Sequence, residues 1–532
     1  MPEALIPGPA ERPLRWDPRR EPCVPAVPRD GTATGELSLV EVFARADELS
    51  TVEADTPGET VALVEYLLAL CFAAGAHPES DDDWRAWIIE GRKLAPVAAW
   101  LGEQPDEDWD LFHPERPLGQ NSLLRKDLAR RGAGPAQLIL EQAGDYSLHF
   151  DHHHLERPEP IPAARAFRAM LTQHVYGLYG RARLSGDELG PRVTNLATAR
   201  LQDRIRVVAL GETLGETLRL NLYPPEGPVG SFNRSWTGAE IERRGFQSKP
   251  PPREVTGPAD LHSYLGRSIL MRPVPGADGG PVAVDRVLIG AGELLALDPG
   301  KHLQDAVFAE QSNGQTRPLW PSVTRSLWHE AHALYSAVRD AEAGLYGRLR
   351  LLTERTRREG RAPYRLRAIG LVSDKTLAVA WTDGSYPYAP GLEDELCEAS
   401  RGGSDIAEYL ASGLKNASHV ARDVTYPNQK PSDKAAQLAR FDARTEFWPA
   451  ARDPFYVLLD DVIIGALVEE ALPTYASVLL VLAREYLRRR LDSLPRNSRG
   501  NRARALAEQS FEKHLTRAKA PAELRRVSAD AP

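Results

Sequence analysis

The pattern of apolar and polar positions changes at about residue 391. Before this point, short alternating runs typical of strands are mixed with helical runs and with stretches rich in Pro and Gly. After it, strand-like alternation disappears and apolar residues recur every three or four positions. We therefore predict an α+β fold. A large mixed domain with irregular loops occupies residues 1–391, and a C-terminal four-helix bundle occupies residues 392–532.

Several N-terminal elements can be placed from the pattern alone. Residues 36–49 have a helical pattern, and residues 59–76 form a helical run that is apolar nearly all round, which predicts burial. Residues 81–88 begin with three Asp residues, which favour the first turn of a helix. Residues 20–27 predict an edge strand, because proline donates no hydrogen bond to a neighbouring strand.

The stretch from residue 144 to residue 223 holds two irregular loops between regular elements. The first loop is rich in His and aromatic residues. The second carries spaced glycines with arginines in or beside it: Gly177, Gly180, Gly186, Gly190, Arg181, Arg183 and Arg192. Glycines allow a backbone to approach a ligand closely, and nearby arginines favour an anionic ligand. The alternative is a pair of surface loops. The stretch ends in a predicted strand at residues 205–209 and a helix at residues 214–222.

Residues 366–381 have the pattern of a β-hairpin. Small or apolar residues alternate along the two arms, at Leu366, Ala368, Gly370, Leu377, Val379 and Trp381. Residues 373–375 are predicted to form the turn. A lysine at its tip is unusual in this chain, which has ten lysines among 66 basic residues.

Two His-rich motifs could indicate a metal-dependent hydrolase. In the segment DHHH at residues 151–154, adjacent histidines such as His152 and His153 do not readily face one ion, so a polar loop is the alternative. In the segment HEAH, His329 and His332 are three positions apart, whereas the zinc-protease motif needs four. No phosphate-binding loop, nucleophile elbow or catalytic cysteine motif is present.

Composition restricts the remaining possibilities. A net charge of −8 does not fit a free-standing basic nucleic-acid binder, so any such contact needs local patches or basic partners. Two Arg-rich segments, residues 348–367 and 484–504, are either solvated helix faces or phosphate contacts. Three scattered cysteines fit a reducing cytoplasm, and the apolar runs are too short to cross a bilayer.

Several segments together resemble the large subunit (CasA) of Cascade, the type I-E CRISPR surveillance complex. The segment REPCVPAV is similar to the family's EPWIPV, SLHFDHH to its ATLFDH, and VVALGETLGETLRLNL to its strand and LxxTLLLNL helix. The segment IGLVSDKTLAVAW resembles the family's hairpin, whose tip commonly reads SDQA. The likeness extends over most of the chain, roughly from Arg20 to Ala520.

The resemblance implies a non-catalytic subunit without a cofactor. Such a subunit works with the other Cascade subunits and CRISPR RNA. It reads the protospacer-adjacent motif (PAM) of target double-stranded DNA from the minor groove, helps to open the duplex, and recruits a helicase-nuclease. A purely architectural subunit that does not touch DNA is a further alternative.

The resemblance also implies a set of DNA-binding residues. They lie in the first recognition loop, the glycine loop, a lysine near the groove and the wedge hairpin: Phe150, Gly177, Gly180, Arg181, Lys301, Ser373, Asp374, Lys375 and Thr376. The chain departs from the family at Cys23, where the family has Trp, and at Lys375, where the family's wedge has Gln. It also lacks the cysteine-rich insert of some members.

Overall fold

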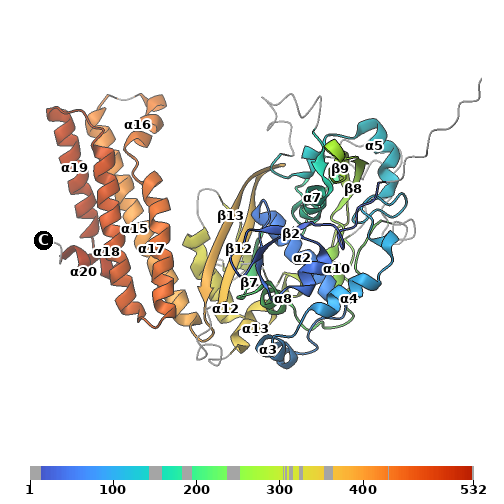
Figure 1. The fold of residues 1–532 in the computed structure, drawn as a ribbon. Helices are drawn as coiled ribbons and strands as arrows, with labels where there is room; N and C mark the ends of the chain where they lie inside the picture. Colours follow the sequence, from blue (N-terminus) through green and yellow to red (C-terminus); the bar gives the residue numbers. More distant parts are fainter. Residues whose placement is uncertain are drawn as a thin grey trace, which may run out of the picture. The chain divides into compact units, whose positions relative to one another are not determined.

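The computed structural model describes residues 14–142, 159–181, 195–236, 252–303, 305, 308–310, 316–322, 327–352, 364–428 and 430–529. The chain forms two compact units (Figure 1). The first comprises Met1–Val323, Ala343–Leu349 and Leu366–Asp383, and the second comprises Thr324–Glu342, Arg350–Arg365 and Gly384–Pro532. Small sheets mixed with helices, and a helical C-terminal region, confirm the predicted α+β class.

The first sheet corrects one prediction. Strand β1 (Val24–Pro28) lies between β2 (Gly35–Leu37) and β3 (Leu49–Val52), so it is a central strand and not an edge strand. Its prolines are tolerated because its two neighbours pair with different halves of the strand. Pro25 is aligned only with β2 and Pro28 only with β3, while Ala26 is aligned with both.

The predicted N-terminal helices are present, but the one predicted over residues 36–49 is much shorter, because its two ends belong to strands β2 and β3. Helix α1 (Leu39–Ala44) begins with a capping box between Ser38 and Glu41. Helix α2 (Pro57–Ala73) is buried along nearly its whole length, as its apolar sequence predicts. Helix α3 (Asp81–Glu90) has Ser80 as its N-cap and three Asp residues in its first turn, and α4 (Ala95–Glu103) follows.

Helix α2 organises the core of the first unit. It packs against α7 (Ala163–Tyr176) and α10 (Pro258–Ser263). Strands β8 (Arg267–Val274) and β9 (Ala283–Ala291) form an antiparallel hairpin extended by β4 (Ile161–Pro162), and α5 (Arg125–Arg131) packs beside it.

The hairpin predicted over residues 366–381 belongs to a further three-stranded sheet. Its strand order is β13-β12-β7, with β7 at Ile205–Leu210, β12 at Tyr364–Asp374 and β13 at Leu377–Tyr388. Helix α8 (Leu214–Asn221), capped by Thr213, follows β7, which confirms the predicted strand and helix. The remaining elements of this unit are β5 (Gly180–Arg181), β6 (Asn195–Leu196), α11 (Pro299–His302), β10 (Phe308–Glu310), β11 (Thr316–Pro318) and the start of α13 (Gly344–Leu351).

The second unit is a helical bundle. Its long helix α15 (Glu393–Thr425) packs against α12 (Ala331–Asp340), α17 (Arg444–Ile463), α18 (Val468–Leu491) and α19 (Ser498–Leu515). Short helices α16 (Lys434–Phe441) and α20 (Ala522–Ala529) accompany them. The apolar pattern of residues 453–472 predicts one continuous helix, but α17 ends at Ile463, and Gly465 takes a φ of +108° in the break.

No helix in the described part of the chain is both long enough and apolar enough to span a membrane.

Candidate nucleic-acid interface

The tip of the β12–β13 hairpin is a two-residue turn. Strand β12 continues through Asp374, so the turn is formed by Lys375 and Thr376, a shift from the predicted residues 373–375. Asp374, Lys375 and Thr376 are exposed, and Ser373 is half-buried. Lys375 has a φ of +56°, a left-handed conformation that costs a residue with a Cβ about 1 kcal/mol. The hairpin therefore holds a cation at its exposed end in a strained backbone.

The base of the tip is fixed to the segment before β7. The Ser373 hydroxyl donates to Asp203 Oδ1 at 3.2 Å, and Asp203 also has a left-handed backbone, with a φ of +59°. Further along β12, a Cβ at Gly370 would lie 2.5 Å from Pro321 Cγ and 3.2 Å from the carbonyl oxygen of Arg204. This close approach requires glycine and places β12 firmly against its neighbours.

The glycine loop and the hairpin tip lie close together. A Cβ built on Gly180 would lie 3.5 Å from Thr376 Cγ2, which is ordinary van der Waals distance. Gly180 and Arg181 form β5, which pairs with β6 at Leu196 and Asn195. Arg181 is exposed. The structure therefore brings together two sets of predicted site residues that are far apart in the sequence.

An aromatic residue that the sequence analysis did not single out adjoins this surface. Tyr179 precedes Gly180 and is 43% exposed. An exposed aromatic ring is a platform on which an unpaired base can stack. The signal in the sequence was an aromatic residue between two glycines, in GLYG.

Gly177 lies deeper than Gly180. It is buried, and a Cβ at this position would lie 2.6 Å from Cζ of the buried Arg267, whose guanidinium donates to the Leu178 carbonyl at 2.7 Å. Burial lowers the pKa of Arg267 to about 10. The absence of a side chain at Gly177 therefore makes room for this guanidinium, and a DNA contact at Gly177 stays a prediction.

The arms of the hairpin are tied to the core by one aromatic residue. The Trp381 ring lies against Gly58 at the start of α2, where an added Cβ would collide with it. The ring packs edge-on against Tyr176, with centroids 4.9 Å apart, and its Nε1 donates to Glu141.

Ion pairs fix the arms as well. Arg367 on β12 is paired with Asp383 on β13 and with Glu53. Burial by itself would lower the pKa of Arg367, but hydrogen bonds with the two carboxylates raise it above its ordinary value.

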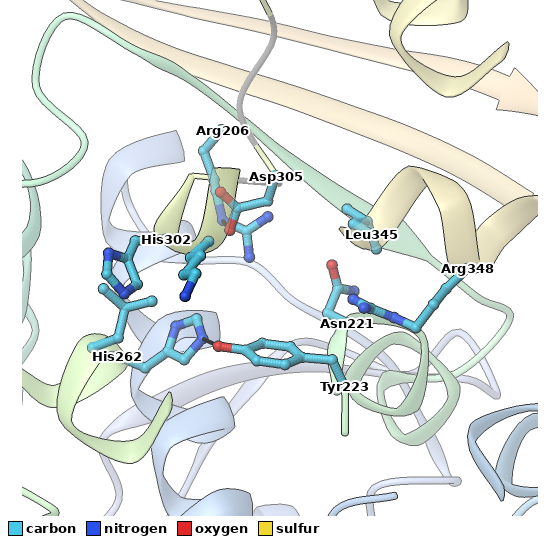
Figure 2. Close-up of a pocket in the computed structure, with 10 residues that line it drawn as sticks. Arg206, Asn221, Tyr223, His262, His302, Asp305, Leu345 and Arg348 are labelled. Carbon is cyan, nitrogen blue, oxygen red and sulfur yellow. Dashed lines mark hydrogen bonds and ion pairs between the residues drawn. The ribbon is translucent and has the colours of Figure 1, made fainter. Parts of the chain in front are cut away.

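Lys301 is placed apart from this surface. It lies on α11, its side chain is 61% exposed, and its Nζ is 3.9 Å from Glu226 Oε2. It lines a pocket together with residues that include Arg206, Tyr223 and Arg348 (Figure 2). Phe150 in the first recognition loop, and Gly186 and Gly190 in the glycine loop, lie outside the described residues.

The His-rich motifs do not assemble into a described metal centre. Residues 151–154 lie outside the described part of the chain. His329 packs among aromatic rings, with its centroid 4.0 Å from that of Trp328 and 4.3 Å from that of Trp448, and His332 Nδ1 lies 3.2 Å from the His329 carbonyl oxygen. Among the residues that the structure describes, no group of three or more His, Cys, Asp or Glu side chains could hold a metal ion.

Several arginines of the second Arg-rich segment are paired with carboxylates. Ion pairs join Arg484 to Glu512, Arg490 to Glu446 and Arg504 to Asp492. This arrangement favours the solvated helix face over a phosphate contact. In the first segment, residues 353–363 lie outside the described residues, and Arg348 is buried.

The comparisons with known proteins agree on one family. The family model for CRISPR-associated protein Cse1 matches residues 20–486. The chain resembles the structure of Thermus thermophilus CasA (Cse1), with 22% identity and a TM-score of 0.74, over 94% of this chain and 99% of that one. It resembles Thermobifida fusca Cse1 with 21% identity and a TM-score of 0.71, over 98% and 99% of the two chains.

A third structural match is a chain of a CRISPR RNA-guided surveillance complex, with 21% identity and a TM-score of 0.66, over 94% of this chain and 100% of that one. No curated protein sequence matches the chain.

Proposed function

Because the chain belongs to the Cse1 family of CRISPR-associated proteins, we propose that it is the large, non-catalytic subunit of a Cascade-type surveillance complex and recognises the PAM in target DNA. Its partners are the other Cascade subunits and CRISPR RNA, as in the surveillance complex whose subunit it resembles. Its residues 1–391 carry recognition and its residues 392–532 form the bundle. After the duplex opens, the subunit recruits the helicase-nuclease.

The proximity of Gly180 to Thr376 carries this proposal. It puts a glycine backbone, the exposed Arg181 and the exposed tip of a hairpin on one surface. The minor groove is narrow, so a reader of its base edges benefits from backbone without side chains and from cations that match its negative potential. That groove distinguishes A·T from G·C pairs but little more, so such a reader accepts several related motifs.

The hairpin supplies the second part of the function. Lys375 stands at the end of two strands that are anchored by Ser373, Gly370 and Trp381. A rigid tip inserted at a base step unstacks it at a cost of about a few kcal/mol, which new contacts and RNA–DNA pairing offset. An acidic chain with a net charge of −8 can act in this way because guide RNA pairing and neighbouring subunits supply the rest of the affinity.

Lys375→Ala tests the wedge role. We expect the variant, assembled with the CRISPR RNA-loaded core, to bind a matched duplex about tenfold more weakly, while binding to the same target with a pre-opened bubble changes by less than about twofold. The measurement is a pair of gel-shift titrations at one salt concentration, because phosphate contacts depend steeply on salt.

Lys375→Gly is the matched control. This substitution removes the same cation as Lys375→Ala, but glycine adopts the left-handed backbone of residue 375 without strain. Comparing the two variants therefore separates the effect of the lost charge from the effect of a changed turn. Both variants should show the same selective defect on the closed duplex. Equal losses on duplex and bubble in both variants would contradict the wedge assignment.

A further inference from the structure

The pocket beside Lys301 contains a buried cation with no carboxylate partner. Arg348, on α13, is 8% exposed, and within the described part of the chain its Nε has no hydrogen-bond acceptor and its guanidinium forms no ion pair. Its Cζ lies 5.3 Å from the centroid of the Tyr223 ring. Figure 2 shows its side chain extending over this ring into the pocket. A buried charge of this kind is costly unless a counter-ion compensates it.

Asp305, which lines the pocket, and Glu65, which lies behind the lining residues Arg206 and His262, are already engaged by other cations. Glu65 is paired with Arg200 and with Arg206, and Arg206 also lies 3.0 Å from Asp305 Oδ2. These pairs neutralise the acidic side of the pocket. Arg348 and Lys301, whose contact with Glu226 is a loose 3.9 Å and exposed to solvent, therefore leave an excess of positive charge.

One histidine adds a directed donor. The backbone N–H of Asp298 donates to His302 Nδ1 at 2.9 Å. In a neutral ring this bond fixes the proton on Nε2, which is then free to donate to a ligand. Burial lowers the pKa of His302, so the neutral form predominates at neutral pH.

The other histidine closes the floor of the pocket. His262 Nδ1 lies 2.7 Å from Glu65 Oε2, and its Nε2 is 3.4 Å from the Tyr223 hydroxyl, the contact marked in Figure 2. Asn221 is also occupied, because its amide nitrogen donates to the carbonyls of Ala209 and Thr217. The donors that face a ligand are therefore Arg348, Lys301 and His302.

We propose that this pocket binds a phosphoryl group through Arg348, Lys301 and His302. Its volume of about 30 Å³ suits about two water molecules or the oxygen atoms of one tetrahedral oxyanion. A guanidinium, an ammonium and an imidazole N–H are the donors that proteins use for phosphate oxygens. The group comes either from free phosphate or from the backbone of a bound nucleic acid. This inference does not depend on the proposed role of the hairpin.

The test is thermal unfolding of the isolated full-length chain in phosphate, compared with chloride at equal ionic strength. We expect 20 mM inorganic phosphate to raise the unfolding midpoint of the wild-type chain by at least about 2 °C. Arg348→Met preserves volume and removes an uncompensated charge. We expect it to unfold at a higher temperature than the wild type in chloride and to lose the phosphate response.

Two further variants make the test specific. Lys301→Ala, at an exposed position, should fold normally and weaken phosphate binding about tenfold in a calorimetric titration. Arg350→Ala removes an exposed arginine from the same helix, one that donates to the Ala341 carbonyl, and should keep the full response. Absence of a response in the wild type, or an equal response in Arg348→Met, would overturn the proposal.

Nucleic acid distinguishes the two sources. If the phosphoryl group belongs to the backbone of a bound nucleic acid, Arg348→Met weakens binding of duplex DNA or CRISPR RNA. Inorganic phosphate then displaces the nucleic acid from the wild-type protein more strongly than chloride does. If the ligand is free phosphate, Arg348→Met leaves nucleic-acid affinity unchanged while the thermal response is lost. Either result is consistent with a phosphoryl site.

Discussion

Gly180 and Thr376 are close neighbours: a Cβ built on the glycine would lie 3.5 Å from the threonine Cγ2. The first belongs to the short strand at the start of the glycine loop and the second to the tip of the hairpin. Gly180 has no side chain, and the exposed Arg181 follows it in the chain, while the exposed Lys375 precedes Thr376 at the tip. This juxtaposition is the basis of the proposed DNA-reading surface.

Substitutions at Gly180 separate packing from charge. Gly180→Ala adds a methyl group at an ordinary contact distance and at a φ that any residue adopts, so we expect folding and DNA binding to change little. Gly180→Asp adds a carboxylate next to Arg181 and should reduce PAM-dependent binding about tenfold or more, through repulsion from the phosphates. The measurement is duplex affinity in the assembled complex. Equal affinities for the Asp and Ala variants would remove Gly180 from the site.

The hydrogen bond between Ser373 and Asp203 is expected to hold the tip in place. Ser373→Ala removes it and should lower the free energy of unfolding by about 1 kcal/mol, with faster hydrogen exchange at residues 373–377. Asp203→Asn keeps an acceptor oxygen and tolerates the φ of +59°, so its effect should be smaller. Unchanged exchange at the turn in Ser373→Ala would show that the hydroxyl does not position the hairpin.

Trp381 depends on the absence of a side chain at Gly58. Gly58→Ala places a methyl group in the space of the indole ring, so Trp381 must move, and we expect a loss of about 1–3 kcal/mol of stability and altered Trp fluorescence. Gly102→Ala in α4 is the control, since a Cβ there meets no atom within 4 Å. It should stabilise the chain by about 0.5–1 kcal/mol. A neutral or stabilising Gly58→Ala would contradict this packing.

Burial of Glu59 gives the stability a dependence on pH. Its side chain is 3.7 Å from Arg168 Nε, yet desolvation dominates and raises its pKa from 4.5 to about 7. As pH rises from about 4.5 to about 7, the unfolded chain loses this proton before the folded chain does. Glu59 therefore lowers stability over this window, by about 1–3 kcal/mol. Glu59→Gln should unfold at a higher temperature than the wild type at pH 8 and at nearly the same temperature at pH 4.5. Parallel pH profiles would contradict the shift.

The sequence pattern predicted local elements well because they depend on local periodicity. The capped helices, the strand before α8 and the hairpin follow from periodicity and turn chemistry. The pattern predicted the wrong structure where contacts between distant segments determine the element. Strand β1 is central and not an edge strand, because β2 and β3 pair with its two sides. The helix expected through Gly465 ends before this residue, which has a left-handed backbone. The turn moved to Lys375 and Thr376 because the β12–β13 ladder extends further than the apolar alternation.

The candidate site was predictable only in part. The resemblance identified Gly180 and the hairpin, but their proximity arises from the fold, and no spacing in the sequence indicates it. The two best-matching glycines also differ in a way that sequence does not reveal. Gly177 is buried against Arg267, whereas Gly180 lies against the exposed tip. The pocket around Arg348 was missed altogether, because its residues come from five separate segments.

The most direct measurement is a gel shift with target duplex DNA, using the CRISPR RNA-loaded Cascade core with and without this protein. The salt concentration should be near physiological, because a lower concentration strengthens non-specific binding. We predict that the protein confers tight binding that disappears when the sequence flanking the target is scrambled, while guide pairing is unchanged. Binding by the core that is equally strong without the protein, or indifferent to the flanking sequence, would contradict PAM recognition and favour a purely architectural subunit.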